Sequence, residues 1–131
     1  DLVFYFLSIT SLMDCPYESA MLITPVTKFQ DQYYVEMNER NELVNCSTVE
    51  TEIRPSGELV GIHKISSQFY RTLVTEYEKI VDQKPKLGYE YQLLDVSRRI
   101  TPMNVLKVDG LQWYEIDDVN DLDFAEKNVK I

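Results

Sequence analysis

Two short apolar runs constrain what this chain can fold into more than any other feature of its sequence. Residues 2–7 are apolar without interruption, and residues 19–24 are nearly so and end at Pro25. A continuous apolar run of this length is typical of a strand covered on both faces, as in a mostly parallel sheet. We therefore expect two core strands, separated by a short helix or turn over residues 8–14.

The middle of the chain favours antiparallel pairing. Residues 33–37 alternate in polarity, and with residues 42–46 they flank the polar stretch 38–41. This is the pattern of a β-hairpin around a four-residue turn. Residues 58–65 are expected to form a further strand after a polar loop.

Three segments have the spacing of helices. The clearest follows Ser66 and Ser67 and runs to about residue 82, with apolar side chains recurring three and four positions apart. A second helix is predicted over residues 89–99. Asp118 is placed to cap a last helix near the end of the chain.

Strands at residues 103–108 and 113–116 complete an α/β pattern. We expect a single domain piece over residues 1–131, with a mixed, mostly parallel sheet and an antiparallel hairpin insertion. The order of elements starts part-way through a sheet, so we interpret the chain as the C-terminal part of a larger domain.

The charge of the chain excludes one large class of partner. Its 22 acidic and 13 basic residues give a net charge of −9, which repels nucleic acid. No apolar run is long enough to span a bilayer, so no membrane partner is expected. Cys15 and Cys46 match no metal-ligand spacing and favour reduced thiols in a cytoplasmic protein.

Residues 113–123 hold the most potential chemistry. Glu115 and Asp117 are two positions apart, so on a strand their carboxylates would face the same way. Such a pair can bind Mg²⁺, which takes one or two protein carboxylates and fills its other positions with water and phosphate. The alternative is that Asp117 or Asp118 only caps the following helix, with Asp121 in its first turn.

The segment Tyr-Glu-Ile-Asp-Asp-Val-Asn-Asp-Leu that starts at Tyr114 resembles the C-terminal signature of phosphocholine cytidylyltransferase-like enzymes, a group that includes sugar-phosphate nucleotidyltransferases. The resemblance implies a Rossmann-like nucleotide-diphospho-sugar transferase fold, with a Mg²⁺ cofactor held by Glu115 and Asp117. Asp1, which directly precedes an apolar run, is similar to a further metal ligand of that family.

Three further stretches follow the order of that family. Residues 19–24 resemble a core strand, residues 59–67 a strand-to-helix element that borders the acceptor pocket, and residues 88–91 an acidic and aromatic segment that lines it. The chain departs from the family because its four glycines are scattered and form no phosphate-binding loop. The resemblance therefore implies that the N-terminal nucleotide-binding part is absent and that this piece alone is inactive.

The segment at residues 88–91 also suggests what the acceptor is. Tyr89, Glu90, Tyr91 and Trp113 are candidates for a pocket that binds a quaternary ammonium by cation–π attraction and a carboxylate, which suits phosphocholine. The alternative is that the tyrosines are half-buried helix residues and that Trp113 belongs to the core. Lys64 is a candidate for contact with phosphate, or else a solvated lysine at a strand end.

Two functions from different classes follow. The first is transfer of a nucleotidyl group from an NTP, with CTP favoured, to phosphocholine, a sugar phosphate or a similar small acceptor, with release of pyrophosphate. The second is a non-catalytic acidic α/β module whose carboxylates serve only as caps. His63, the only histidine, is interpreted as structural. An open sheet edge near Asp1 favours pairing with a second copy of the chain, as a homo-oligomer.

Overall fold

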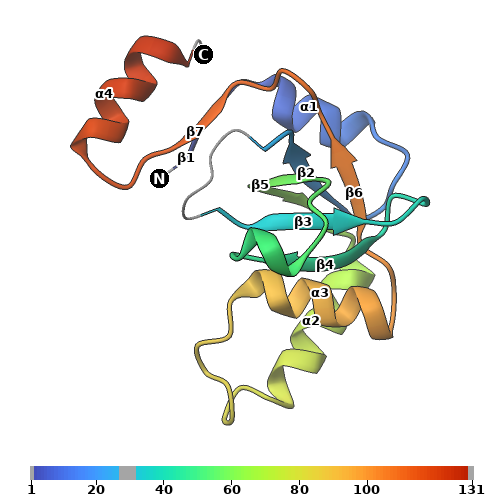
Figure 1. Ribbon diagram of the computed structural model, residues 1–131. Coiled ribbons are helices and arrows are strands. Elements are labelled where there is room, and N and C mark those ends of the chain that lie inside the picture. The colour runs from blue at the N-terminus through green and yellow to red at the C-terminus, as the bar shows by residue number, and fades with distance from the viewer. Residues whose placement is uncertain (1, 27–31, 130–131) are drawn as a thin grey trace.

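The computed structural model describes residues 2–26 and 32–129. In chain order the elements are β1 (Leu2–Phe4), α1 (Leu7–Asp14), β2 (Ala20–Thr24), β3 (Tyr34–Met37), β4 (Leu43–Ser47), the 3₁₀ turn η1 (Glu50–Glu52), β5 (Gly57–Lys64), α2 (Ser67–Glu78), α3 (Tyr89–Arg99), β6 (Asn104–Lys107), β7 (Trp113–Glu115) and α4 (Val119–Asn128). Figure 1 shows a sheet with helices packed on it and, to one side, β1, β7 and α4. Within the described ranges, no helix is long and apolar enough to cross a membrane.

The main sheet has five strands in the order β4-β3-β5-β2-β6, and β1 pairs with β7 in a separate two-stranded ribbon. The expected mixed α/β architecture is confirmed, and so is the β3–β4 hairpin. The expectation that the sheet is mostly parallel is wrong for the described strands, because β2–β6 is the one parallel pair among them. The hairpin and the return of β5 account for the antiparallel pairs.

Strand β2 lies at the centre of the core, and all five of its residues are buried. Met21 and Ile23 belong to one hydrophobic cluster, which includes Phe69 of α2. Leu22 lies on the other face, in a second cluster with Leu12 of α1. Helices therefore cover both faces of β2, which explains why its sequence is apolar at every position rather than at every second one.

The first apolar run behaves differently from the expectation. Strand β1 ends at Phe4, its three residues are only half-buried, and it pairs antiparallel with β7. Its last ladder bond is donated by the N–H of Tyr5 to the carbonyl of Gln112 (3.0 Å), and the N–H of Ser8 then bonds the carbonyl of Tyr5 (2.9 Å) as the chain turns into α1. A buried core strand over residues 2–7 is thus wrong, because a helix begins within the run.

A bulge interrupts the pairing of β2 with β5. Met21 pairs with His63 and Ile23 with Leu59, so β5 has two more residues than β2 between these pairs. Gly61 lies in the bulge with φ +84°, a backbone conformation that favours glycine. The bulge therefore depends on glycine at this position.

The helix boundaries follow their caps. The Ser66 hydroxyl accepts a hydrogen bond from the N–H of Phe69 (3.1 Å), which confirms the predicted cap of α2. Helix α2 ends at Glu78 rather than near residue 82, and turns follow it. At α4, Asp118 accepts from the N–H of Asp121 (3.0 Å) and Asp121 accepts from the N–H of Asp118 (3.2 Å), forming a capping box.

Candidate functional site

A cavity of about 350 Å³ lies where the β1–β7 ribbon meets the β5 bulge and the start of α3. Its lining residues are Leu2, Gln32, Tyr33, Leu59, Val60, Gly61, Tyr89, Glu90, Trp113 and Glu115. We call it the ribbon pocket. Four residues that the sequence singled out come together here, three as substrate contacts and one as a metal ligand: Tyr89, Glu90, Trp113 and Glu115.

The first turn of α3 places a carboxylate in the wall of the ribbon pocket. Gly88 is the N-cap residue, and Glu90 is buried in the turn that follows. A carboxylate in a first helical turn is stabilised by the helix dipole. A Cβ at Gly88 would lie 2.7 Å from Oε2 of Glu90 and 3.4 Å from the hydroxyl of Tyr33. The absence of a side chain at Gly88 thus leaves room for these two groups.

Two tyrosine hydroxyls interact with the Glu90 carboxylate. Partial burial raises the pKa of Tyr89 to about 12, and the charge of Glu90 and a hydrogen bond to it act in the same direction. The pKa of Tyr33 is also raised, first by burial and then by the charge of Glu90. Both phenols are therefore neutral at physiological pH and can donate hydrogen bonds to the carboxylate.

Trp113 connects the ribbon with the main sheet. Its indole N–H donates to the hydroxyl of Thr24 at the end of β2 (3.1 Å). The ring packs against the cluster that contains Leu22 and also lines the ribbon pocket. One part of the Trp113 side chain therefore packs on the core and another borders the cavity, and its contact with a substrate stays a prediction.

The acidic residues of the C-terminal segment separate into two groups. Glu115 is the last residue of β7 and lines the ribbon pocket. Its negative charge raises the pKa of Tyr89, although burial and Glu90 contribute more to this shift. Asp117 lies beyond the strand, so the two carboxylates do not share a strand face as expected. The N–H of Asp117 donates to Asp121 (3.1 Å), and this bond turns the chain toward α4.

The predicted metal ligands are only partly placed. Within residues 2–26 and 32–129, the carboxylates of Glu115 and Asp117 accept no hydrogen bond and form no ion pair. In the same ranges, no cluster of three or more His, Cys, Asp or Glu side chains is arranged to hold a metal. Asp1 lies outside the described residues.

Two predicted substrate contacts do not reach the ribbon pocket. Tyr91 is two positions after Tyr89, and on a helix such residues point in different directions. Tyr91 lines a different cavity, between α2 and α3, and its ring meets that of Tyr33 edge to face. Lys64 donates from Nζ to the carbonyls of Cys15 (3.1 Å) and Met13 (3.4 Å), and its contact with phosphate stays a prediction.

His63 contacts one of the residues that line the ribbon pocket. Its ring contacts that of Tyr89 edge to face, with 5.4 Å between the centroids. Burial lowers the pKa of His63 to about 4, while a hydrogen bond with the backbone of Gly61 opposes this shift. Its Nε2 is buried and has no hydrogen-bond partner among the described residues. The neutral ring fits the structural interpretation of this residue.

Sequence reasoning missed Tyr33 and Gln32. Both lie just before β3, and Gln32 is buried although it is polar. Tyr33 was interpreted only as part of a strand, because nothing in its local pattern indicates that it meets Glu90, which is far along the chain. The nearness of Tyr33 to residues 88–91 depends on the pairing of β3 with β5.

No protein-family model matches the chain. Among solved structures, it is similar to the inositol-1-phosphate CTP transferase from Thermotoga maritima, with a TM-score of 0.70 and 15% identity over 92% of this chain and 48% of that one. It is also similar to the CTP:phosphocholine cytidylyltransferase from Streptococcus pneumoniae, with a TM-score of 0.67 and 13% identity over 85% and 48% of the two chains.

A third structure, CMP:2-keto-3-deoxy-manno-octonic acid synthetase complexed with CTP, matches with a TM-score of 0.60 and 14% identity over 92% of this chain and 53% of that one. The chain therefore has the fold of part of a CTP-utilising nucleotidyltransferase, as its sequence resemblance implies. It spans about half the length of the structures that it matches.

Proposed function

We propose that this chain forms the acceptor-binding part of a nucleotidyltransferase that transfers a nucleotidyl group from CTP to a small phosphorylated acceptor. The observation that carries the proposal is the shared fold of three CTP-utilising transferases over 85% or more of this chain. The ribbon pocket supports it, because residues from five separate parts of the chain meet there around a buried carboxylate.

The lining of the pocket supports an acceptor with a cationic end. Two carboxylates, Glu90 and Glu115, line it together with three aromatic side chains, and no basic side chain is among its described lining residues. A quaternary ammonium is attracted by aromatic faces and by a nearby carboxylate. The phosphate of either acceptor must be neutralised from outside the pocket, so the two acceptors differ only in the part that the pocket would hold. We infer that phosphocholine suits this pocket better than a sugar phosphate does, because only phosphocholine has a cationic end.

A Mg²⁺ ion fits the donor chemistry of the acidic segment that follows β7. Glu115 and Asp117 are exposed, and their carboxylate oxygens are the hard ligands that Mg²⁺ prefers. We propose that these two residues and Asp1 hold the ion. When bound, it would neutralise nucleotide phosphate charge that this acidic chain cannot neutralise itself.

The proposed reaction is an in-line displacement. A phosphate oxygen of the acceptor attacks the α-phosphorus of CTP, the bond to the β-phosphate oxygen breaks, and pyrophosphate leaves with the electron pair. The residues of the chain act by position: Glu90 and the aromatic side chains hold the far end of the acceptor so that its phosphate faces the nucleotide. No proton needs to be removed, because the attacking phosphate oxygen is already ionised.

The test is pyrophosphate release by the longest natural chain that contains this sequence, measured with CTP, phosphocholine and varied Mg²⁺. We expect turnover to fall at least tenfold in Glu115→Gln and Asp117→Asn, with a higher Mg²⁺ requirement. The matched control is Asp123→Asn, an exposed carboxylate on α4 that does not line the pocket. Normal turnover in Asp117→Asn would remove this residue from the metal site.

One observation favours the second candidate, a non-catalytic binding module. Asp118 and Asp121 are fully engaged in the capping box of α4, so much of the acidic segment has a structural task. If every natural form of the protein binds choline compounds in the ribbon pocket but releases no pyrophosphate from any nucleoside triphosphate, the binding module is the better description.

A further inference from the structure

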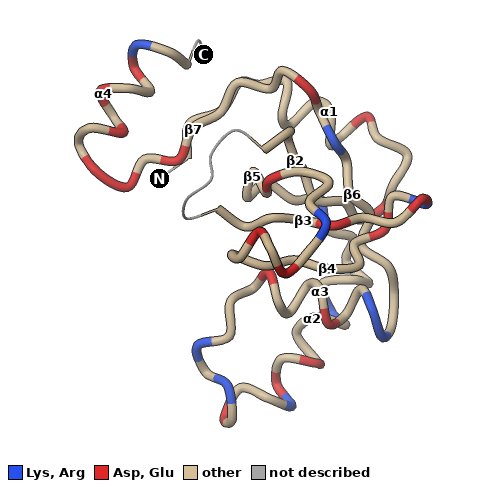
Figure 2. The backbone as a smooth tube through the Cα atoms, viewed as in Figure 1, with Lys and Arg blue, Asp and Glu red and all other residues tan. Residues whose placement is uncertain are grey.

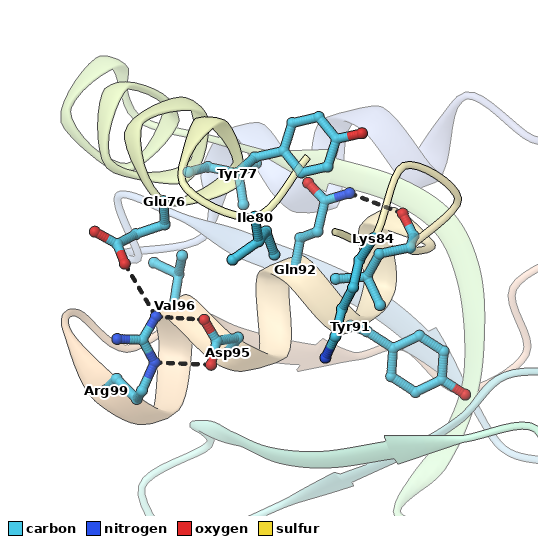
Figure 3. A pocket seen from close by; sticks show the side chains of 11 residues that line it. Glu76, Tyr77, Ile80, Lys84, Tyr91, Gln92, Asp95, Val96 and Arg99 are labelled. Atoms are coloured by element: carbon cyan, nitrogen blue, oxygen red, sulfur yellow. Dashed lines mark hydrogen bonds and ion pairs between the residues drawn. The ribbon is translucent and has the colours of Figure 1, made fainter. Parts of the chain in front are cut away.

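A second cavity, of about 430 Å³, lies between α2, α3 and the turn that joins them (Figure 3). We call it the interhelix cavity. Its apolar lining consists of Leu73, Tyr77, Ile80, Leu87, Tyr91 and Val96. A volume of this size falls in the range of small-molecule sites, roughly 300–1,000 Å³. The interhelix cavity shares no lining residue with the ribbon pocket, so the proposed transfer reaction does not use it.

One end of the interhelix cavity is held by a network of charges. The Arg99 guanidinium donates from Nε to Asp95 (2.7 Å) and from Nη2 to Glu76 (3.0 Å), and these bonds are drawn in Figure 3. Asp95 and Arg99 belong to α3 and Glu76 to α2. The network therefore joins the two helices at this end of the cavity.

A cation on the connecting turn also lines the cavity. Lys84 forms no ion pair within the described ranges. The hydrogen bond from Arg99 is the main cause that lowers the pKa of Asp95, and the positive charge of Lys84 adds to this effect. Residues 79–99 contain five basic and three acidic side chains, in a chain with a net charge of −9. Figure 2 shows basic positions gathered along this turn and at the end of α3.

We propose that the interhelix cavity binds a small ligand with an aromatic or branched apolar body and one anionic group. The apolar body would pack between Leu73, Ile80 and Leu87, where its burial provides the main driving force. The anionic group pairs with Lys84, which lines the cavity and forms no ion pair within the described ranges. An anion is favoured over a cation because the two carboxylates, Glu76 and Asp95, are already balanced by two cations, Arg99 and Lys79.

The interhelix cavity is coupled to the ribbon pocket by two touching rings. Tyr91 lines the interhelix cavity, Tyr33 lines the ribbon pocket, and their ring centroids are 5.9 Å apart in an edge-to-face contact. Both residues also lie beside Gly88, at the start of α3. A ligand that moves Tyr91 therefore also moves Tyr33, which hydrogen-bonds with Glu90.

The test uses 8-anilinonaphthalene-1-sulfonate as the probe, because it combines an aromatic body with one anionic group. We expect saturable binding of one molecule per folded chain, followed by fluorescence at a temperature well below the cooperative unfolding transition. Lys84→Gln should weaken binding by about two- to fivefold, the range expected for one exposed ion pair. Lys86→Gln, on the same turn but outside the lining, is the matched control and should leave binding unchanged.

A second variant and a second measurement complete the test. Leu87→Trp fills the interhelix cavity and should abolish binding while the far-ultraviolet circular dichroism stays the same. Amide chemical shifts should change at Tyr91 and, through the ring contact, at Tyr33. Non-saturable binding, or equal effects of Lys84→Gln and Lys86→Gln, would overturn the site. Shifts confined to α2 and α3, with none at Tyr33, would overturn the coupling.

Discussion

Strands β1 and β2 have similar apolar sequences but different surroundings. All five residues of β2 are buried, between helices on both faces of the sheet. The three residues of β1 are half-buried, and β1 pairs only with β7. The comparison teaches that an apolar run identifies a strand, whereas the depth of its burial depends on which elements pack over it.

The ribbon pocket lies on the boundary between these two regions. Main-sheet residues such as Val60 and Gly61 form one wall, and Leu2, Trp113 and Glu115 of the ribbon form another. The hydrogen bond from Trp113 to Thr24 joins them. A pocket between a deeply packed region and a thinly packed one can keep a rigid carboxylate on one side and an adaptable wall on the other.

The largest effect should separate the two strands directly. Leu22→Ala removes a completely buried side chain and should lower the free energy of unfolding by about 2–5 kcal/mol. Val3→Ala, in β1, removes a half-buried side chain and should cost less than about 1 kcal/mol. Urea unfolding followed by circular dichroism measures both. Equal losses would mean that the ribbon is packed as tightly as the sheet.

Acid should weaken the main sheet through His63 in β5. Because burial lowers its pKa to about 4, the folded chain binds fewer protons there than the unfolded chain does. The contribution of neutral His63 to the free energy of unfolding is complete above pH 6.5. It is lost as the pH falls toward 4, which lowers the free energy of unfolding by roughly 3 kcal/mol. Urea unfolding at pH 7 and pH 4 should show this extra loss in the wild type.

The control for this pH effect is His63→Phe, which keeps a ring beside Tyr89 but cannot bind a proton. Its loss of stability between pH 7 and pH 4 should be smaller than that of the wild type by roughly the same 3 kcal/mol. Parallel losses in the two proteins would show that His63 titrates normally and is not held in a buried neutral state.

The smallest effect should be confined to the ribbon side of the molecule. Asp118→Ala removes the capping box of α4 and should destabilise that helix by about 1 kcal/mol. Hydrogen exchange should become faster at the first N–H groups of α4 and stay unchanged in β2. Faster exchange in β2 would show that α4 and the main sheet unfold together and would weaken the distinction between the two regions.

Much of the fold could be predicted because local patterns decide it. The hairpin turn at residues 38–41, the Ser66 cap and the Asp118 cap each depend on neighbouring residues, and all three are confirmed. The extent of β1 and the antiparallel balance of the sheet could not be predicted, because both depend on which strands pair far along the chain. The start of α1 inside an apolar run also gives no sequence signal.

Part of the candidate site could be predicted, because several of its acidic and aromatic residues lie close together in the sequence. Tyr89, Glu90 and Glu115 were found because acidic and aromatic residues lie together in short stretches of sequence. Tyr33 was missed because only the folded chain brings it to Glu90. Tyr91 was grouped with Tyr89 because the two are close in sequence, but the helix turns Tyr91 toward a different cavity. The metal role of Asp117 stays a prediction.

The most direct measurement is binding of choline to the 131-residue chain, compared with binding of its neutral isostere 3,3-dimethyl-1-butanol by amide chemical shifts. We predict that choline shifts the amides of Tyr33, Gly61 and Glu90, and that the isostere binds at least tenfold more weakly. Glu90→Gln should remove this preference, while Glu78→Gln, an exposed control on α2, should keep it. Equal binding of the two compounds, or an unchanged preference in Glu90→Gln, would contradict the proposal that the ribbon pocket holds a cationic acceptor.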